Sequence, residues 1–298
     1  MISKEEISDK YQELQRAICL SLENEDGVAR FKEDRWERPE GGGGISRIIE
    51  DGKLIEKGGV NFSSVYGATP DKIKQSFGYD ATEFYATGLS IVLHPNNPFV
   101  PIIHMNIRYF EMNDGNWWFG GGIDLTPHYI DRSDASFFHS SLKEVCDQHH
   151  ESFYIRFKKW ADDYFFIKHR KETRGIGGIF FDRLNRDGGK DALFNFSLDV
   201  GKSFIPMYTK ISRKNKAVPF TEKERKWQLI RRGRYAEFNL VLDRGTKFGL
   251  ETNGRIESIL MSLPPLASWK YNHSPEKNSP EYETIKLLRK DIDWINMH

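Results

Sequence analysis

Polar and apolar side chains alternate along residues 102–111, which is the pattern of a β-strand whose two faces meet different surroundings. One face consists of core-type side chains: Ile103, Met105, Ile107 and Tyr109. The other face carries groups that bind or react, followed by an aromatic ring: His104, Asn106, Arg108 and Phe110. In the preceding run, Ser90 and His94 share a face with Val92 between them. Because burying such groups without partners is costly, we expect the two strands to line a site that meets a polar ligand.

Helical periodicity is clearest at the beginning of the chain. Ser3 and Glu6 have the spacing of a capping box. Apolar residues then recur every three or four positions: Ile7, Tyr11, Leu14, Ile18 and Leu22. This helix is predicted to end near Gly27. Further helices are predicted within 133–171, over 191–215, over 221–232 and over about 280–293.

Strand-like runs fill most of the remaining chain. The glycine-rich stretch 41–67 predicts two or more strands with tight turns, and further strands are predicted over 117–126, 174–185, 234–245 and 256–263. The four glycines at 41–44 match no phosphate-binding motif, so we interpret them as a loop that closes over a ligand. Several connections are too short for a crossover helix. The pattern therefore favours an antiparallel or mixed sheet covered by helices, in a single domain spanning residues 1–298.

The composition narrows the class of protein. The 298 residues carry 44 Lys+Arg and 43 Asp+Glu, a net charge of +1, which argues against a nucleic-acid-binding domain with its strongly basic footprint. The two cysteines, Cys19 and Cys146, cannot form a CxxC motif and suit a reducing cytoplasm. No apolar run approaches the ~20 residues of a membrane span, and the first residues lack the pattern of a signal or transit peptide. The aromatic content of 13% suits either a flat ligand or ordinary core packing.

Four histidines in separate segments are candidates for one shared site: His94, His104, His139 and His169. Four imidazoles are enough for a metal centre, but their spacing matches no compact motif such as HExxH. The alternative is that they are hydrogen-bonded histidines beside a cleft. The sequence leaves both interpretations open.

Two carboxylates stand where a ligand could reach them. Asp124 follows three glycines, which allow close approach to the backbone, and Asp243 directly precedes Arg244. A carboxylate in such a place accepts hydrogen bonds from ligand N–H groups or acts as a base. Each is equally well explained as a turn or cap residue.

The arginines differ in their value as ligand candidates. Arg108 is flanked by core residues on its strand and is the strongest candidate for pairing with a ligand carboxylate. Arg255 is the second, because Gly254 permits a tight turn that would present it. The RRGR cluster at 231–234 is interpreted as surface or interface. No nucleophile, flavin, nicotinamide or pyridoxal motif is present, so an enzyme on this chain would use acid–base and charged groups, with or without a metal.

Several long segments carry a resemblance to a known family: GGGGISR, GGVNFS, HPNNPFVPIIHMNIRYF, WWFGGGIDLTP, KHRKETRGIGGIFFD, RRGRYAEFNLVLDRGT and GRIESILMSLPP. In this order they closely resemble the aerobic, oxygen-dependent coproporphyrinogen III oxidases, over nearly the whole chain. The resemblance implies an α/β fold of the α+β type, in which helices flank both faces of a large antiparallel sheet. It also implies a homodimer whose interface includes a strand region at about 235–270.

The resemblance implies an activity as well. The family oxidatively decarboxylates the propionates on rings A and B of coproporphyrinogen III to vinyl groups. The product is protoporphyrinogen IX, on the way to haem, and molecular oxygen is the electron acceptor. No organic cofactor is implied. Reduced porphyrinogens are electron-rich, so an enzyme can work by positioning and base catalysis.

The resemblance also assigns roles by motif position. His104 matches the proton donor of the family, and Asp243, with Arg244, matches the carboxylate that engages the pyrrole N–H groups. The positions that match substrate binding or activity are Ser90, Asn106, Arg108, Asp124, Asn253, Gly254 and Arg255. Metal-binding positions of bacterial members match His94, His104, His139 and His169, so a divalent metal such as manganese is an open expectation. One departure is Asn253, where many bacterial members have glycine.

Two other functions stay open at this point. A non-catalytic tetrapyrrole-binding protein would need the arginines but not Asp124, Asp243 and His104 together, so the presence of all three favours the enzyme. A histidine-bound metal oxygenase acting on another aromatic acid would require a bound redox metal.

Overall fold

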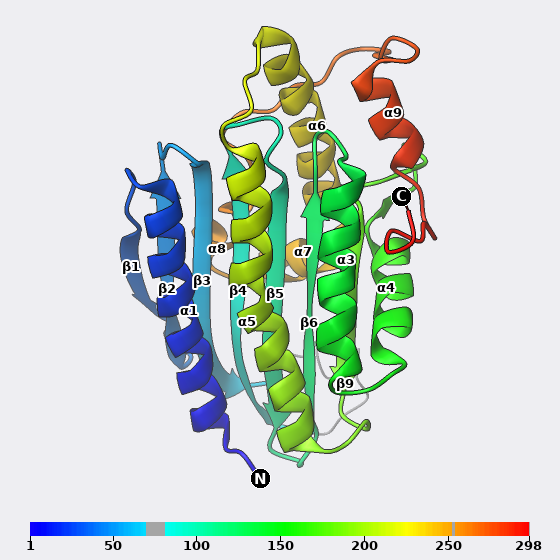
Figure 1. Ribbon diagram of the computed structural model, residues 1–298. Helices are drawn as coiled ribbons and strands as arrows, with labels where there is room; N and C mark the ends of the chain where they lie inside the picture. The colour runs from blue at the N-terminus through cyan, green and yellow to red at the C-terminus, as the bar shows by residue number, and fades with distance from the viewer. Residues whose placement is uncertain (70–80, 252–253, 298) are drawn as a thin grey trace.

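The computed structural model describes residues 1–69, 81–251 and 254–297. Its centre is a seven-stranded sheet with the strand order β1-β2-β3-β4-β5-β6-β9 (Figure 1). The strands are β1 (Lys32–Glu37), β2 (Gly42–Glu50), β3 (Ile55–Ala68), β4 (Glu83–Pro95), β5 (Ile102–Met112), β6 (Trp117–Thr126) and β9 (Gly177–Leu184). All neighbouring strands in this sheet pair antiparallel, since short connections such as 51–54 have no room for a crossover helix. The predicted antiparallel sheet is confirmed.

Four helices cover one face of the sheet: α1 (Lys4–Asp26), α3 (Arg132–Asp147), α4 (Phe153–Tyr164) and α5 (Lys190–Asn215) (Figure 1). The apolar side chains of β5 point into this layer, where Ile103 and Ile107 are fully buried in the main core. The predicted capping box of Ser3 and Glu6 is present, and α1 ends at Gly27 in the left-handed conformation. The sequence pattern therefore identified both the core face of the sheet and the first helix that packs against it.

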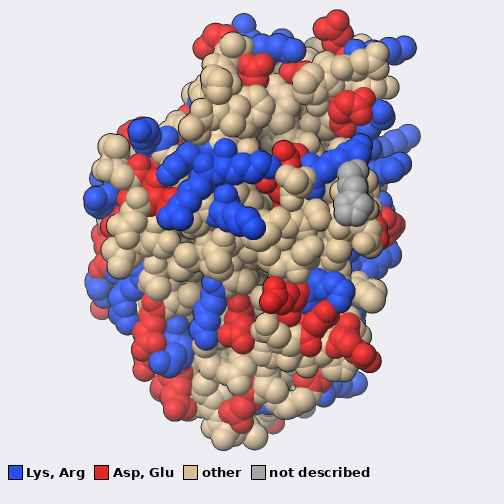
Figure 2. Space-filling model, in the orientation of Figure 1, with Lys and Arg blue, Asp and Glu red and all other residues tan. Residues whose placement is uncertain are grey.

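The outer surface of this helical layer mixes acidic and basic side chains (Figure 2). Near the end of α5 the basic groups are paired. Arg213 and Lys216 contact Glu25, and the ammonium of Lys214 lies 2.7 Å from a carboxylate oxygen of Asp134. Because the carboxylates of Glu25 and Asp134 are only 9% and 15% exposed, the surface at this end of α5 is mainly basic (Figure 2).

A second group of helices covers the opposite face of the sheet: α6 (Glu222–Val241), α7 (Arg244–Glu251) and α8 (Ile256–Leu260) (Figure 1). The chain that follows α9 (Pro280–Leu287) contacts α4, where the backbone N–H of Asp291 donates to Asp162. A two-stranded ribbon of β7 (Phe166–Ile167) and β8 (Glu172–Thr173) stands apart from the main sheet. Helices therefore lie on both faces of the antiparallel sheet, as the resemblance implied.

Two predicted strands are helical. Residues 234–245 belong mostly to α6, and residues 256–263 contain α8. The alternating letters of RYAEFNLVL fit a strand, but Tyr235 and Phe238 are also three positions apart, and both are buried along one side of the helix. The residues of the 235–270 region that the structure describes are accordingly helix and loop rather than strand.

Three other boundaries also differ from the predictions. Glycines 42–44 lie within β2 rather than in a loop, where a side chain on Gly44 would collide with the ring of Trp36 on the neighbouring strand. Residues 133–171 hold two separate helices followed by the β7–β8 ribbon. The last helix ends at Leu287 rather than at 293.

Candidate active site

The polar face predicted for residues 102–111 is confirmed, and it faces α6 rather than the main core. Val92, which shares this face, packs against α6. The register of the sheet places Ser90 opposite Asn106, and His104 opposite Asp124. Strands β4, β5 and β6 therefore bring side chains from three sequence segments onto one surface.

Glycines occupy the positions beside these polar side chains. Gly88 and Gly120 flank Arg108 on the two neighbouring strands, and Gly122 lies beside Asn106. A Cβ atom at Gly88 would lie 2.8 Å from a backbone carbonyl oxygen, and one at Gly122 would lie 2.6 Å from another. We call these three glycines the glycine floor. Since they carry no side chains, the Arg108 side chain can lie over Gly120, and a flat ligand can approach the backbone of the sheet beside it at Gly88.

Hydrogen bonds link three ionisable side chains across the site: His104, Asp124 and Arg174. Nδ1 of His104 lies 2.8 Å from one oxygen of Asp124, and Arg174 donates to the other oxygen over 2.7 Å. Burial opposes ionisation of Asp124, but the charge of Arg174 and the hydrogen bond from His104 outweigh it and lower the pKa of this carboxyl. Asp124 is therefore a carboxylate that orients the His104 ring, while Nε2 of that ring stays available for proton transfer.

Arg174 is a site residue that the sequence reasoning missed. Its side chain is only 3% exposed, and its guanidinium lies 4.4–4.8 Å from the ring centres of Phe165, Tyr235 and Phe238. It also donates to the side-chain oxygen of Asn239 on α6 over 2.8 Å. In the sequence it belongs to the run KHRKETR, which has the composition of an exposed loop. Only its contact with Asp124, 50 positions away, marks it as part of the site.

Arg108 lies flat against the glycine floor. One terminal nitrogen donates to the side-chain oxygen of Asn106 over 3.0 Å, and the other donates to Asp182 of β9 over 2.8 Å. The side chain keeps 40% of its surface exposed. Guanidinium groups in such a position pair with ligand carboxylates, as the sequence suggested for Arg108.

Arg255 lies on the same face at the other side of the sheet. It contacts Asp34 of β1, and it donates to the hydroxyls of Ser258 and Ser46 over 3.1 and 3.4 Å. Ser46 is on β2, and the Arg108 guanidinium lies over Gly120 of β6, so four strand spacings, roughly 19 Å, separate the two guanidinium positions. Gly254 is held by a backbone hydrogen bond to Gly249. The third member of the predicted turn, residue 253, lies outside the described residues.

Asp243 lies at the end of α6, on the same side of the sheet as Arg174. The hydroxyl of Tyr164 donates to one of its oxygens over 2.7 Å, and the backbone N–H of Thr246 donates to the other over 2.7 Å. The charge of Asp243 contributes to the raised pKa of Arg174, although Asp124 contributes more against the opposing effect of burial. Asp243 is thus both a helix cap and a neighbour of the buried ion pair. Arg244 is exposed.

The four histidines considered for a metal do not converge. His139 lies in the helical layer on the other side of the sheet, where its ring nitrogens bond to Tyr154 and to the carbonyl oxygen of Ile176. His94 is buried beside α6, and His169 contacts Glu237. Burial lowers the pKa of both His94 and His139 to about 3, so both are neutral. In the described ranges, no three His, Cys, Asp or Glu side chains are arranged to hold a metal ion. These four residues therefore do not fit one metal ion.

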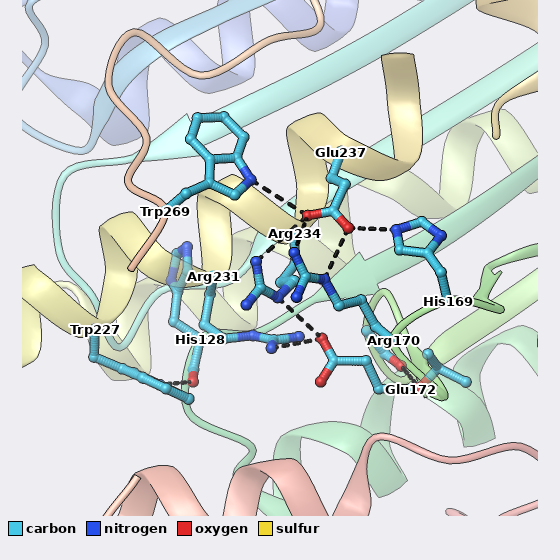
Figure 3. Close-up of polar contacts among 11 residues, drawn as sticks. His128, His169, Arg170, Glu172, Trp227, Arg231, Arg234, Glu237 and Trp269 are labelled. Atoms are coloured by element: carbon cyan, nitrogen blue, oxygen red, sulfur yellow. Dashed lines mark hydrogen bonds and ion pairs between the residues drawn. The ribbon is translucent and has the colours of Figure 1, made fainter. Parts of the chain in front are cut away.

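A network of ion pairs supports the wall of the site formed by α6 (Figure 3). Glu237 accepts two hydrogen bonds from Arg170, over 2.8 and 3.0 Å, and is also contacted by His169, Arg234 and Trp269. Burial opposes its ionisation, but the bonds from Arg170 and His169 lower the pKa of Glu237 to about 2. The network fixes α6 against the β7–β8 ribbon and the chain after α8.

The cluster at 231–234 was interpreted as surface or interface, and as exposed surface this was wrong: all three of its arginines are buried within the chain. Arg231 and Arg232 pair with Glu172 and Glu56 over 2.8 and 2.7 Å, and Arg234 lies 3.4 Å from Glu237. The error arises because these residues lie on the helix α6, where neighbouring side chains point in different directions. Some therefore face the sheet and others face the β7–β8 ribbon.

Across the described ranges, each helix falls short of the length and apolar character that crossing a bilayer requires.

The fold and the site together define a class of protein. A glycine-lined face of the sheet that carries two guanidinium groups, with a carboxylate–histidine pair beside one of them, suits an enzyme that acts on a flat molecule with several carboxylates. The comparison with known sequences gives the particular family. Residues 6–294 match the coproporphyrinogen III oxidase family, and the chain belongs to it.

Individual relatives are similar over nearly the whole chain. A protein of Glycine max named oxygen-dependent coproporphyrinogen-III oxidase, chloroplastic, is 50% identical over an aligned length of 299 residues, and the alignment covers 95% of this chain and 77% of the relative. An oxygen-dependent coproporphyrinogen-III oxidase of Drosophila melanogaster is 51% identical over 297 residues, 95% of this chain and 76% of the relative. One of Prochlorococcus marinus is 50% identical over 309 residues, 95% of this chain and 88% of the relative.

Proposed function

We propose that this chain oxidatively decarboxylates the propionates on rings A and B of coproporphyrinogen III to vinyl groups, with molecular oxygen as the acceptor. The product is protoporphyrinogen IX, so the enzyme acts in haem biosynthesis. The observation that carries the proposal is the glycine floor with Arg108 beside it and the His104–Asp124–Arg174 chain at its edge. Family membership and the names of the relatives support the same reaction.

The arrangement of charges suits this substrate. Coproporphyrinogen carries four propionates around a macrocycle, and the Arg108 and Arg255 guanidinium groups lie roughly 19 Å apart on one face of the sheet, by the spacing of its strands. The macrocycle would lie on this face between them, with Gly88 beneath it. Ser90 and Asn106, neighbours on the same face, would contact it between the two arginines.

The proton chemistry is assigned to His104 and Asp243. Asp124 holds Nδ1 of His104, which leaves Nε2 to donate a proton to reduced oxygen. Asp243 would accept a hydrogen bond from a pyrrole N–H and so increase the electron density of the ring. Arg244 follows Asp243 directly in the chain. Oxygen then attacks the ring, and the bound peroxide takes a β-hydrogen from the propionate as carbon dioxide leaves. Each turnover converts one propionate and one O₂ into a vinyl group, CO₂ and H₂O₂.

Product analysis tests the reaction. The purified chain is incubated with chemically reduced coproporphyrinogen III in air and under nitrogen, and the oxidised products are separated by HPLC. We expect protoporphyrin in air alone. Tight binding without conversion would favour the tetrapyrrole-binding alternative, and conversion under nitrogen would contradict the role of oxygen.

A chelator added to a parallel aerobic sample tests the metal. We expect unchanged turnover, since the four candidate histidines lie on both sides of the sheet. Loss of turnover, with recovery when manganese is added, would contradict this and favour a metal site.

We also propose that the chain acts as a homodimer through residues of the 235–270 region. This part of the chain is rich in exposed apolar side chains: Leu240, Val241, Leu250, Ile256, Leu266 and Trp269. Exposed patches of this kind mark protein interfaces. Light scattering coupled to size-exclusion chromatography should give twice the chain mass of 34.7 kDa, and the variant Leu266→Glu should shift it towards the monomer. A monomer for the unaltered chain at micromolar concentration would contradict the proposal.

A cytoplasmic location is a further part of the proposal. Cys19 and Cys146 are both buried free thiols, which suits a reducing compartment. Relatives carry names that place them in chloroplasts or mitochondria, so the location needs its own test. Fractionation of the source cells should recover the chain with cytosolic markers, and recovery with organelles would contradict this location.

A further inference from the structure

An irregularity in strand β9 lies directly beside Arg108. Between Phe119 and Gly121 of β6, the paired strand β9 contains one residue more than regular pairing allows. The extra residue belongs to the pair Asp182 and Arg183, which together oppose Gly120. Such β-bulges change the direction of side chains, and they are frequent next to active sites.

The bulge strains the backbone at Arg183 and changes the face to which the side chains after it point. Arg183 has a φ angle of 50°, a left-handed conformation that is unfavourable for a residue other than glycine. Phe181 and Leu184 both lie in the main core, although regular alternation would put them on opposite faces. The bulge therefore lets Asp182 point to the polar face while Leu184 returns to the core.

The contact made by Asp182 depends on a glycine. Its Oδ1 atom lies 2.8 Å from a terminal nitrogen of Arg108. A Cβ atom on Gly120 would lie 2.7 Å from both Asp182 Oδ1 and Arg108 Nε, so a side chain at 120 would separate the pair. The two side chains are 34% and 40% exposed, and so exposed an ion pair contributes little to stability. Stability alone therefore does not account for a strained bulge and a glycine at this place.

We propose that Asp182 is a positioning residue that fixes the Arg108 guanidinium over Gly120 for a substrate propionate. Asn106 holds one terminal nitrogen and Asp182 holds the other, so the plane of the group is set from two sides. These bonds use two of five N–H groups, and the others are donors for a carboxylate of the ligand. The inference rests on the proposed function, and it adds a residue from β9 to the binding of substrate.

If Asp182 instead competed with the substrate for Arg108, its removal would change substrate binding in the opposite direction. If the substrate had to displace Asp182 from Arg108, removing this carboxylate would tighten binding. If Asp182 positions Arg108, its removal lets the guanidinium move and weakens binding. The sign of the change in KM therefore separates the two roles.

The test compares Asp182→Ala, Asp182→Asn and Gly120→Ala with the unaltered chain. We expect Asp182→Ala to raise KM for coproporphyrinogen III about tenfold and to leave kcat within about twofold, because a charge-assisted bond is lost far from the reacting atoms. Asp182→Asn keeps an acceptor oxygen and should restore most of the affinity. Gly120→Ala removes no charge, yet it should raise KM as well, because it separates Asp182 from Arg108.

Two controls tie the effect to Arg108. Asp187→Ala breaks a matched surface pair, with 2.8 Å between Asp187 and Arg156 and side chains 30% and 45% exposed, and it should leave KM unchanged. In an Arg108→Ala background, Asp182→Ala should add no further loss of affinity. Binding of the fluorescent probe coproporphyrin III gives the same comparison without turnover, and thermal unfolding shows that each variant is folded.

The outcomes separate the two proposals. A KM for Asp182→Ala that is unchanged or lower would overturn the positioning role while the reaction stands. An equal rise in KM for Asp187→Ala would also overturn it, since the effect would then be general. Absence of turnover in the unaltered chain would overturn the proposed function itself, and the positioning role with it.

Discussion

Replacing Arg174 by methionine removes the cation that lies 2.7 Å from the buried Asp124. Both side chains are nearly inaccessible, with 3% and 2% of their surfaces exposed. Breaking a buried ion pair from one side costs about 3–5 kcal/mol, because the remaining charge is left without compensation. We expect the free energy of unfolding of Arg174→Met to fall by this amount, since methionine fills the space between the aromatic rings but supplies no charge.

The same change should impair catalysis through the state of Asp124. Burial alone raises the pKa of this carboxyl, and the charge of Arg174 and the bond from His104 are what lower it. Without Arg174, Asp124 takes up a proton at higher pH and no longer orients His104 as a carboxylate. We expect kcat to fall about 100-fold, the lower end of the range for losing a positioned acid–base group.

Urea unfolding and steady-state kinetics on three variants test this reasoning. Adding Asp124→Asn to Arg174→Met removes the stranded charge, so it should recover about 2 kcal/mol of stability without recovering kcat. Arg231→Met breaks another buried pair, with Glu172, and should lower stability while kcat stays within about threefold. The reasoning is refuted if Arg174→Met keeps full stability and turnover, or if Asp124→Asn destabilises that variant further.

Three other changes test separate parts of the structure. His104→Ala should lower kcat at least 100-fold without unfolding the chain, as measured by HPLC turnover and circular dichroism, since a positioned proton donor is lost. Asp26→Asn should lower the free energy of unfolding by about 3 kcal/mol, because the carboxylate accepts backbone hydrogen bonds from residues 53–55, where β3 begins, and from Ala29 after α1. Burial opposes ionisation of Asp26, but these hydrogen bonds outweigh it and lower the pKa of the carboxyl. The stability that Asp26 contributes is therefore fully present above its ordinary pKa and is lost as the pH falls through the lowered pKa of the folded state. Unfolding measured over an acid titration would show this loss. Gly59→Ala would collide with the sulfur of Met261, so protease cleavage near α8 should become faster, and unchanged cleavage would contradict this packing.

The sequence was most informative where one strand separates two environments. The alternation in β5 correctly placed Ile103 and Ile107 in the core and His104 and Arg108 on the polar face, because a period of two leaves only one choice of face. The N-terminal cap of α1 was likewise readable, since a capping box is a local signal.

Contacts between distant segments could not be predicted in this way. Arg174 meets Asp124 only because β9 pairs with β6 and brings the preceding turn beside it. Asp182 reaches Arg108 through a bulge that has no signature in the sequence. His139 resembled a ligand beside His104 because sequence distance carries no information about which side of the sheet a helix covers.

The central claim is that the substrate lies on the polar face of the sheet between Arg108 and Arg255. A crystal structure of the chain with coproporphyrin III bound tests this most directly. We predict the macrocycle over β4 at Gly88, with one propionate on Arg108 and the reacting edge towards His104. A macrocycle bound to the other side of the sheet, among α1, α3 and α5, would contradict the account.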